Sequence, residues 1–234
     1  MDDLKVQLFK SKKQGIKQPK ASQNDILPRI HCSYLIIGKS GSGKTNVVLH
    51  MLNSKNLLKG VFDCILYICG SPDDTFKDNL DIPKENFITN FDEEWLSGLI
   101  EKQKGNVKNK GFLKTKSILL IFDDILSKPK FLNSKTMMKL VTECRHYNIS
   151  NFFLTQSYKK IPRTIRLNVR GLIFFPSSLN EMIKFAEEQC LPAMSNKHFL
   201  KLINHATAEP YQFCFINHDS VEDKIRKNFT TILK

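Results

Sequence analysis

The sequence predicts an α/β fold in which a mostly parallel central sheet is flanked by helices. Apolar runs of about four to eight residues recur along the chain, as expected for strands that are covered on both faces. Segments with helical spacing of apolar residues lie between these runs, and such alternation favours parallel pairing. In folds of this kind, ligands bind at the carboxyl ends of the strands.

The expected strands are near-continuous apolar runs: residues 32–38, 64–70, 86–91, 117–124, 151–156, 171–176 and 211–217. The expected helices cover residues 45–58, 92–104, 134–147, 179–190 and 195–206, with a last helix over 221–234. Asp92, Ser134, Asn180 and Ser195 are residue types that cap helix N-termini, and we expect them to do so here.

The first 29 residues are polar and rich in lysine, with no periodic apolar face. They predict a flexible basic arm over residues 1–29, followed by one domain over residues 30–234. No apolar run is long enough to span a bilayer, and the N-terminus lacks the apolar block of a secretion signal. We therefore expect a soluble protein made in the cytosol, with no membrane partner.

The composition is strongly basic, with a net charge of +13 and a pI near 9.4. Such a surface attracts polyanions, and nucleic acid is the leading candidate; a basic surface without such a partner is the alternative. Six cysteines are scattered without C-x-x-C spacing, which predicts reduced thiols rather than a metal site.

The segment GKSGSGKT, residues 38–45, follows an expected strand and opens an expected helix. This context identifies the pattern G-x-x-x-x-G-K-[ST] as a P-loop, which binds nucleotide phosphates. Its glycines let backbone N–H groups point at phosphate oxygens, Lys44 supplies charge for the β and γ phosphates, and Thr45 offers a hydroxyl to Mg²⁺. The predicted nucleotide-binding residues are Gly38, Lys39, Ser40, Gly41, Ser42, Gly43, Lys44 and Thr45.

The run SILLIFDD ends in two carboxylates, Asp123 and Asp124. An apolar strand with this ending is the expected Walker B element, so we assign Asp123 to the magnesium ion and Asp124 to orienting and deprotonating the attacking water. The alternative is a pair of acidic turn residues. Gln156 ends another apolar strand, where its amide is placed to sense the γ-phosphate. Polar residues also end strands for no functional reason.

These three strand ends, in this order, resemble the FtsK/HerA superfamily of DNA-pumping ATPases. Residues 143–175 resemble, more narrowly, the genome-packaging ATPases of poxviruses, other large DNA viruses and their virophages, and the similarity covers about residues 30–217. It implies a RecA-like core that binds ATP and Mg²⁺ and assembles into a ring, a hexamer or pentamer. It also implies packaging of double-stranded DNA through a capsid portal or vertex, in the host cytoplasm at the viral factory, with the virion as a second location.

In that superfamily an arginine before the glutamine-bearing strand reaches into a neighbouring subunit, and Arg145 matches its position. The resemblance thus implies an arginine finger acting in trans and a sensor role for Gln156; an exposed helix-end cation is the alternative for Arg145. The chain has no recognisable separate DNA-reading domain, which favours the viral packaging branch.

Two lysine-rich stretches are candidates for DNA contact. The first is predicted to be a mobile loop and carries Lys102, Lys104, Lys108, Lys110, Lys114 and Lys116; the second carries Lys159, Lys160, Arg163, Arg166 and Arg170. Either stretch could contact phosphates without reading bases, or be a solvated basic face. Arg163 and Arg166 could instead lie at a subunit interface.

Two other functions fit the P-loop. The first is a small nucleotide or metabolite kinase, whose activity would be independent of DNA and of assembly. The second is a nucleic-acid-binding protein that uses ATP only as a switch, with negligible turnover.

Overall fold

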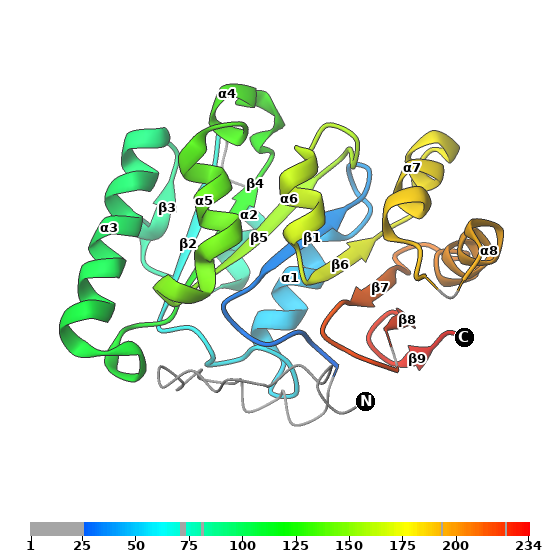
Figure 1. Cartoon of the computed structure of the whole chain (residues 1–234), viewed down its shortest axis with the longest axis horizontal. Coiled ribbons are helices and arrows are strands. Elements are labelled where there is room, and N and C mark those ends of the chain that lie inside the picture. The colour runs from blue at the N-terminus through cyan, green and yellow to red at the C-terminus, as the bar shows by residue number, and fades with distance from the viewer. Residues whose placement is uncertain (1–25, 71–73, 81, 193, 223) are drawn as a thin grey trace, which may run out of the picture.

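The computed structural model describes residues 26–70, 74–80, 82–192, 194–222 and 224–234. A nine-stranded sheet in the order β3-β2-β4-β5-β1-β6-β7-β8-β9 runs through the middle of the molecule, with helices on both faces (Figure 1). The strands are β1 Ser33–Ile37, β2 Cys64–Cys69, β3 Phe87–Ile88, β4 Ile118–Asp123, β5 Ile149–Thr155, β6 Gly171–Phe174, β7 Cys214–Asn217, β8 Ile225–Lys227 and β9 Thr231–Ile232.

The strands from β3 to β6 in this order pair in parallel, which confirms the predicted mostly parallel sheet. The strands from β6 to β9 pair antiparallel. The helix expected over residues 221–234 is wrong, because this segment forms β8 and β9. Asn228 has a φ of 55°, a left-handed conformation that ends a helix but suits a turn between strands.

The helices are α1 Lys44–Asn53, α2 Asp74–Asn79, α3 Glu93–Lys110, α4 Pro129–Leu132, α5 Lys135–Glu143, α6 Arg163–Asn168, α7 Leu179–Gln189 and α8 Asn196–Ala206. Short 3₁₀ turns cover Lys84–Asn86, Phe112–Lys114, Ile125–Ser127 and Cys144–Tyr147. Asp92, Ser134 and Ser195 accept capping hydrogen bonds as predicted. The predicted cap at Asn180 is wrong, because the cap is Ser178, two residues earlier, and α7 begins at Leu179.

Helix α3 corrects a third expectation. The lysine-rich stretch that starts at Lys102 is helical as far as Lys110, so it is not a mobile loop. Leu96, Ile100 and Gln103 form one buried face of the helix, which extends into the lysine-rich stretch. The Gln103 amide donates a hydrogen bond to the Lys116 carbonyl at 2.6 Å. This helical periodicity outweighs the glycines and lysines that suggested a loop.

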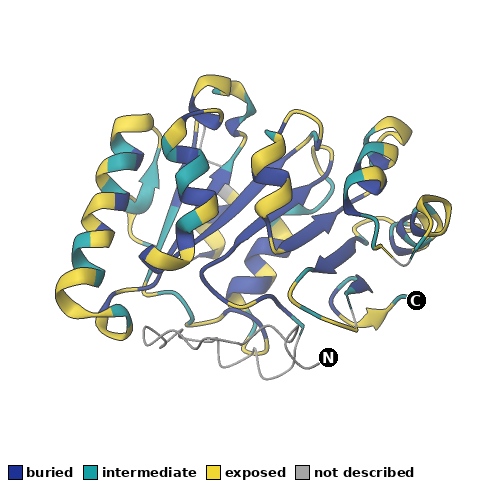
Figure 2. Ribbon diagram, in the orientation of Figure 1, coloured by how far each residue is buried: buried dark blue, intermediate teal, exposed yellow. Residues whose placement is uncertain are grey.

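The central strands are buried along most of their length (Figure 2), and their successive side chains point to opposite faces of the sheet. On β1, Leu35 and Ile37 join the core beneath α3, α5, α6, α7 and α8, whereas Tyr34 and Ile36 join the core beneath α1 and α2. Helices therefore cover both faces, which explains why these strands are mostly apolar in sequence. The carboxyl ends of the parallel strands remain open, and the loops of the site lie there.

The predicted arm falls mostly outside the described residues, and its end contacts the domain. Leu27 is buried, and the Ile26 carbonyl accepts a hydrogen bond from the Asn217 amide at 3.1 Å. None of the six cysteines forms a disulfide in the part of the chain that the structure describes. Among the described helices, none is both long and apolar enough to cross a membrane.

Candidate functional site

The loop between β1 and α1 has the tight geometry of a phosphate-binding turn. Its first residue, Gly38, donates its N–H to the Thr155 carbonyl of β5 at 3.0 Å. A Cβ at Gly38 would clash with the Ser42 hydroxyl and would lie 2.8 Å from the Phe175 Cβ, so only glycine fits. Gly43 has a φ of 103°, which also requires glycine.

Helix α1 begins at Lys44 with no side-chain cap and no acidic residue in its first turn, so its first N–H groups remain available to an anion. The Lys44 ammonium donates to the carbonyls of Gly38 and Lys39 at 2.9 and 3.0 Å. Burial lowers the pKa of this amine, while the charges of Asp123 and Asp124 oppose that shift. The ammonium is thus held beside the loop by contacts that a phosphate can replace.

The acidic edge lies at the end of β4. Asp123 is the last residue of the strand, and its Oδ2 accepts a hydrogen bond from the Tyr67 hydroxyl of β2 at 2.8 Å. Burial raises the pKa of Asp123, and the Tyr67 hydrogen bond and the Lys44 charge act against it. Asp124 follows in a left-handed conformation with a φ of 50°, which turns the chain and leaves its carboxylate exposed.

Strand β5 lies between β1 and β4, so Gln156, which follows β5, lies between the P-loop and the acidic edge. All three elements line one cleft of about 440 Å³. Its lining residues are Ser40, Gly41, Gly43, Lys44, Thr45, Asn46, Tyr67, Cys69, Thr75, Asp123, Asp124, Leu154, Thr155, Gln156 and Tyr211. The sequence-predicted residues at three strand ends are therefore brought together, as a shared site requires.

Three predicted nucleotide-binding residues are not among those that line the cleft. Gly38 is buried behind the loop, Lys39 is exposed, and the buried Ser42 hydroxyl has no hydrogen-bond partner among the described residues. These three residues belong to the loop through their backbone, and the side chains of Lys39 and Ser42 do not line the cleft. The cleft also includes residues that sequence analysis missed, notably Tyr67, Thr75 and Tyr211, because no motif marks their separate elements.

Arg145 lies away from this cleft. It is exposed in the 3₁₀ turn before β5, whereas Gln156 follows the other end of the strand. Seven residues of extended chain separate the two ends, a span of about 20 Å. Arg145 therefore does not reach the cleft of its own chain, and its predicted role in a neighbour's site stays a prediction.

The family described as Poxvirus A32 protein matches residues 23–232. The chain belongs to this family. Protein 075L of Invertebrate iridescent virus 6, an uncharacterized protein, is 25% identical over 150 residues, which cover 64% of this chain and 56% of that one. Protein 015R of Frog virus 3, also uncharacterized, is 25% identical over 143 residues, covering 60% and 42%. The chain thus spans about half the length of the curated relatives it matches.

Among solved structures, the genome packaging NTPase B204 of Sulfolobus turreted icosahedral virus 2, in complex with AMPPCP, superposes with a TM-score of 0.58 at 16% identity. The match covers 87% of this chain and 99% of that one. EssC, ATPases 2 and 3, from Geobacillus thermodenitrificans has a TM-score of 0.53 at 14% identity, covering 85% and 39%. At these identities the likeness shows a common fold. The chain is thus a member of the Poxvirus A32 protein family whose fold is shared with B204 and EssC.

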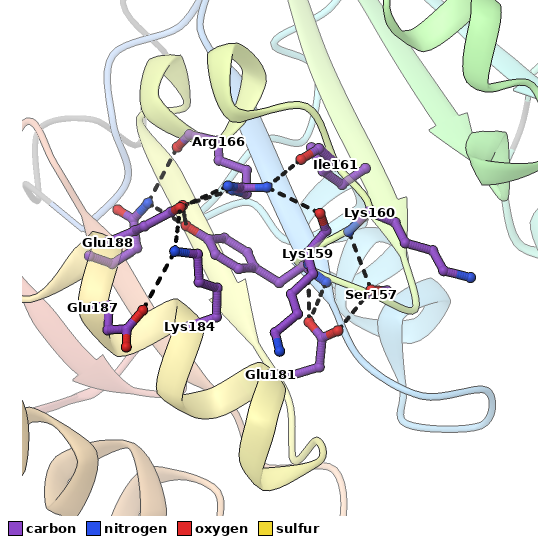
Figure 3. A network of polar contacts seen from close by, with 11 residues as sticks. Ser157, Lys159, Lys160, Ile161, Arg166, Glu181, Lys184, Glu187 and Glu188 are labelled. Carbon is purple, nitrogen blue, oxygen red and sulfur yellow. Dashed lines mark hydrogen bonds and ion pairs between the residues drawn. The ribbon is translucent and has the colours of Figure 1, made fainter.

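A network of polar contacts lies beside the cleft of this A32-family domain, between α6 and α7 (Figure 3). Arg166 forms a bidentate ion pair with Glu188, with two N···O distances of 2.7 Å, and both side chains are about nine-tenths buried. Its other nitrogen donates to the carbonyls of Ile161 and Lys159. The prediction that Arg166 contacts DNA or another subunit is therefore wrong, because Arg166 is enclosed within its own domain.

The same network holds the segment that follows Gln156. The Glu181 carboxylate accepts from the Ser157 hydroxyl and the Tyr158 N–H at 2.8 Å each, and from the Lys159 N–H at 3.2 Å (Figure 3). The Tyr158 hydroxyl donates to Glu188 at 2.9 Å. Helix α7 thus fixes the chain directly after Gln156, so a displacement of Gln156 would be transmitted to α7.

Breaking the buried ion pair should cost much of the domain's stability. Arg166→Ala leaves the buried Glu188 carboxylate with only the more exposed Lys184 contact, so we expect the free energy of unfolding to fall by about 3–5 kcal/mol in urea titrations. Burial opposes ionisation of Glu188, but the hydrogen bonds from Arg166 and Tyr158 lower its pKa to about 2. The pair's contribution is therefore complete above about pH 4.5, the ordinary pKa, and is lost as pH falls towards 2.

Lys184→Ala is the matched control, because Lys184 pairs with the same Glu188 at 3.4 Å from a more exposed position. We expect it to cost less than about 1 kcal/mol. Equal losses for the two variants would show that the Arg166 pair is no stronger than a surface contact.

Proposed function

We propose that the protein hydrolyses ATP with Mg²⁺ and uses the energy to move double-stranded DNA into a viral capsid. The single cleft that brings together the P-loop, the Asp123–Asp124 edge and Gln156 carries this proposal. Family membership supports it, as does the fold shared with B204, a genome packaging NTPase solved with ATP analogues. The proposed place of action is the infected cell's cytoplasm, at a capsid portal or vertex.

The loop, Lys44, Thr45 and Asp123 have proposed roles in binding the phosphates and the metal ion. The N–H groups of the loop and the Lys44 ammonium bind the β and γ phosphates. The Thr45 hydroxyl and the Asp123 carboxylate line the same cleft and are the hard oxygen donors that Mg²⁺ prefers. When bound there, the ion would neutralise charge on the phosphate oxygens.

Hydrolysis needs a water aligned with the γ-phosphate. Asp124 is exposed on the cleft wall. In this proposal its carboxylate orients that water and accepts its proton. The γ-phosphoryl group then passes from ADP to the water oxygen, giving ADP and phosphate. Gln156 hydrogen-bonds the γ-phosphate or this water, and its link to α7 through residues 157–159 passes the change to the rest of the domain.

DNA should stimulate turnover if hydrolysis is coupled to translocation. We expect long duplex DNA to raise the steady-state ATPase rate, and added salt to weaken the effect, because phosphate contacts release counterions. The measurement is ATP turnover against DNA concentration at several salt concentrations. A rate that is indifferent to DNA at low salt would contradict coupling and favour the kinase. DNA binding with negligible turnover would favour the ATP-switched binding protein.

The segment after Gln156 is the proposed DNA contact. Lys159, Lys160 and Arg163 are exposed there and sit on the chain that Glu181 fixes. Replacing all three by alanine should reduce DNA stimulation and lower the salt slope by about 1 for each DNA phosphate that the variant no longer binds.

The matched control removes three exposed charges from α3, by replacing Lys102, Lys108 and Lys110 with alanine. We expect this variant to retain most of the DNA stimulation. If the α3 variant loses more stimulation than the first variant, the contact surface lies on α3 instead.

A further inference from the structure

Tyr211 is an exposed aromatic residue at the rim of the cleft. Its side chain is 69% exposed, yet it lines the same cleft as Lys44 and Asp123. A Cβ at Gly43 would lie 3.4 Å from the Tyr211 Cδ1, so the ring lies against the start of α1. One edge of the Tyr211 ring thus lies beside the phosphate-binding turn, and the rest of the ring faces solvent.

The backbone of Tyr211 is held in an unfavourable conformation. Its φ is 63°, in the left-handed region that bulky residues rarely adopt. The turn before β7 is closed by two hydrogen bonds from Gln212 to Glu209, one between backbones at 3.3 Å and one between side chains at 3.0 Å. Such strain persists where the surroundings impose it, and it occurs preferentially at ligand-binding sites.

Aromatic packing joins this turn to the P-loop. Phe213 packs on Phe175 and Phe229, with ring centroids 5.3 and 5.1 Å apart, and its N–H donates to the Asn228 side chain at 3.2 Å. Phe175 in turn lies directly against Gly38 and Gly43. The position of Tyr211 relative to the P-loop is therefore set by packing in the core.

We propose that Tyr211 stacks on the base of the nucleoside triphosphate bound in this cleft. The inference rests on the proposed function, because it requires the cleft to bind a triphosphate. The inner residues of the cleft suit phosphates: backbone N–H groups, Lys44 and Thr45. A base attached to those phosphates needs an apolar face near the mouth, and an aromatic ring supplies it for any base with a π face.

The test compares a ligand that has a base with one that lacks it. Tyr211→Asn removes the ring, and asparagine tolerates the left-handed backbone, so the turn is preserved. We expect this variant to bind a non-hydrolysable ATP analogue about 5- to 100-fold more weakly than wild type, while its affinity for inorganic tripolyphosphate is unchanged. Tyr211→Phe keeps the ring and should retain wild-type affinity for both ligands. Isothermal titration calorimetry measures both sets of affinities.

The outcomes separate this inference from the proposed function. If the wild-type protein binds neither ligand, the proposed function fails. If wild type binds both and Tyr211→Asn binds the ATP analogue as tightly, the stacking role is wrong. An equal loss for both ligands would also overturn it, because the ring would then support the P-loop rather than the base. Loss of assembly with unchanged affinities would assign Tyr211 to a subunit contact instead.

Discussion

Lys44→Ala is expected to abolish nucleotide binding and to reduce ATP turnover at least about 100-fold, the loss seen when one preorganised charge-stabilising donor is removed. The Lys44 ammonium is the cation at the start of α1, where it already donates to two loop carbonyls. Alanine keeps the helix but leaves the phosphates without this charge. Turnover in steady state and ligand-induced thermal stabilisation measure the two effects.

Stabilisation by nucleotide gives the sharper measurement. A ligand at about 100 times its Kd stabilises the folded state by about 2.7 kcal/mol, and this gain should vanish in Lys44→Ala. Lys59→Ala is the control, because Lys59 is exposed in the segment after α1 and does not line the cleft. Wild-type turnover in Lys44→Ala would refute the assignment of the loop to phosphate binding.

The parallel half of the fold could be predicted because each buried strand shows its apolar pattern within its own residues. A strand covered on both faces is buried at nearly every position, so most of its residues are apolar. Continuous apolar runs mark β1, β4 and β5: residues 34–37, 118–122 and 152–154. The antiparallel end could not be predicted in this way. Strands β8 and β9 are short, and β8 is defined by pairing with β7 rather than by its own residues. From sequence alone, the polar residues around Asn228 are equally compatible with an exposed helix and with the turn that joins β8 and β9.

The candidate site likewise contains residues that sequence motifs reveal and residues that only tertiary contacts place there. The P-loop and the end of β4 carry motifs, so their meeting at one edge could be expected once the sheet was taken as parallel. Tyr67, Glu181 and Tyr211 carry none. Tyr67 reaches Asp123 from the next strand, Glu181 reaches residues 157–159 from α7, and Tyr211 depends on the packing of Phe213. Their roles arise from tertiary contacts between segments that are far apart in sequence.

Arg145→Ala should bind ATP normally yet hydrolyse it about 1,000-fold more slowly, the lower end of the effect of an arginine finger. Arg145 is exposed and lies about 20 Å from the cleft of its own chain, so its loss leaves the nucleotide contacts intact. In a ring, a head-to-tail interface would place it near the phosphates of the next subunit. Its neighbour His146, exposed in the same turn, supplies the control variant His146→Ala, for which we expect wild-type turnover.

Mixing inactive variants tests whether the arginine acts in trans. Arg145→Ala subunits have an intact cleft, and Asp124→Asn subunits have an intact arginine. In an equal mixture about one interface in four therefore combines both intact parts, and we expect turnover to return in proportion. A mixture of Asp124→Asn with Lys44→Ala is the control, because every cleft in it is defective. Recovery only in the first mixture would support a shared site. If neither mixture recovers while rings form normally, each cleft works with its own residues, and the arginine has no catalytic partner across the interface.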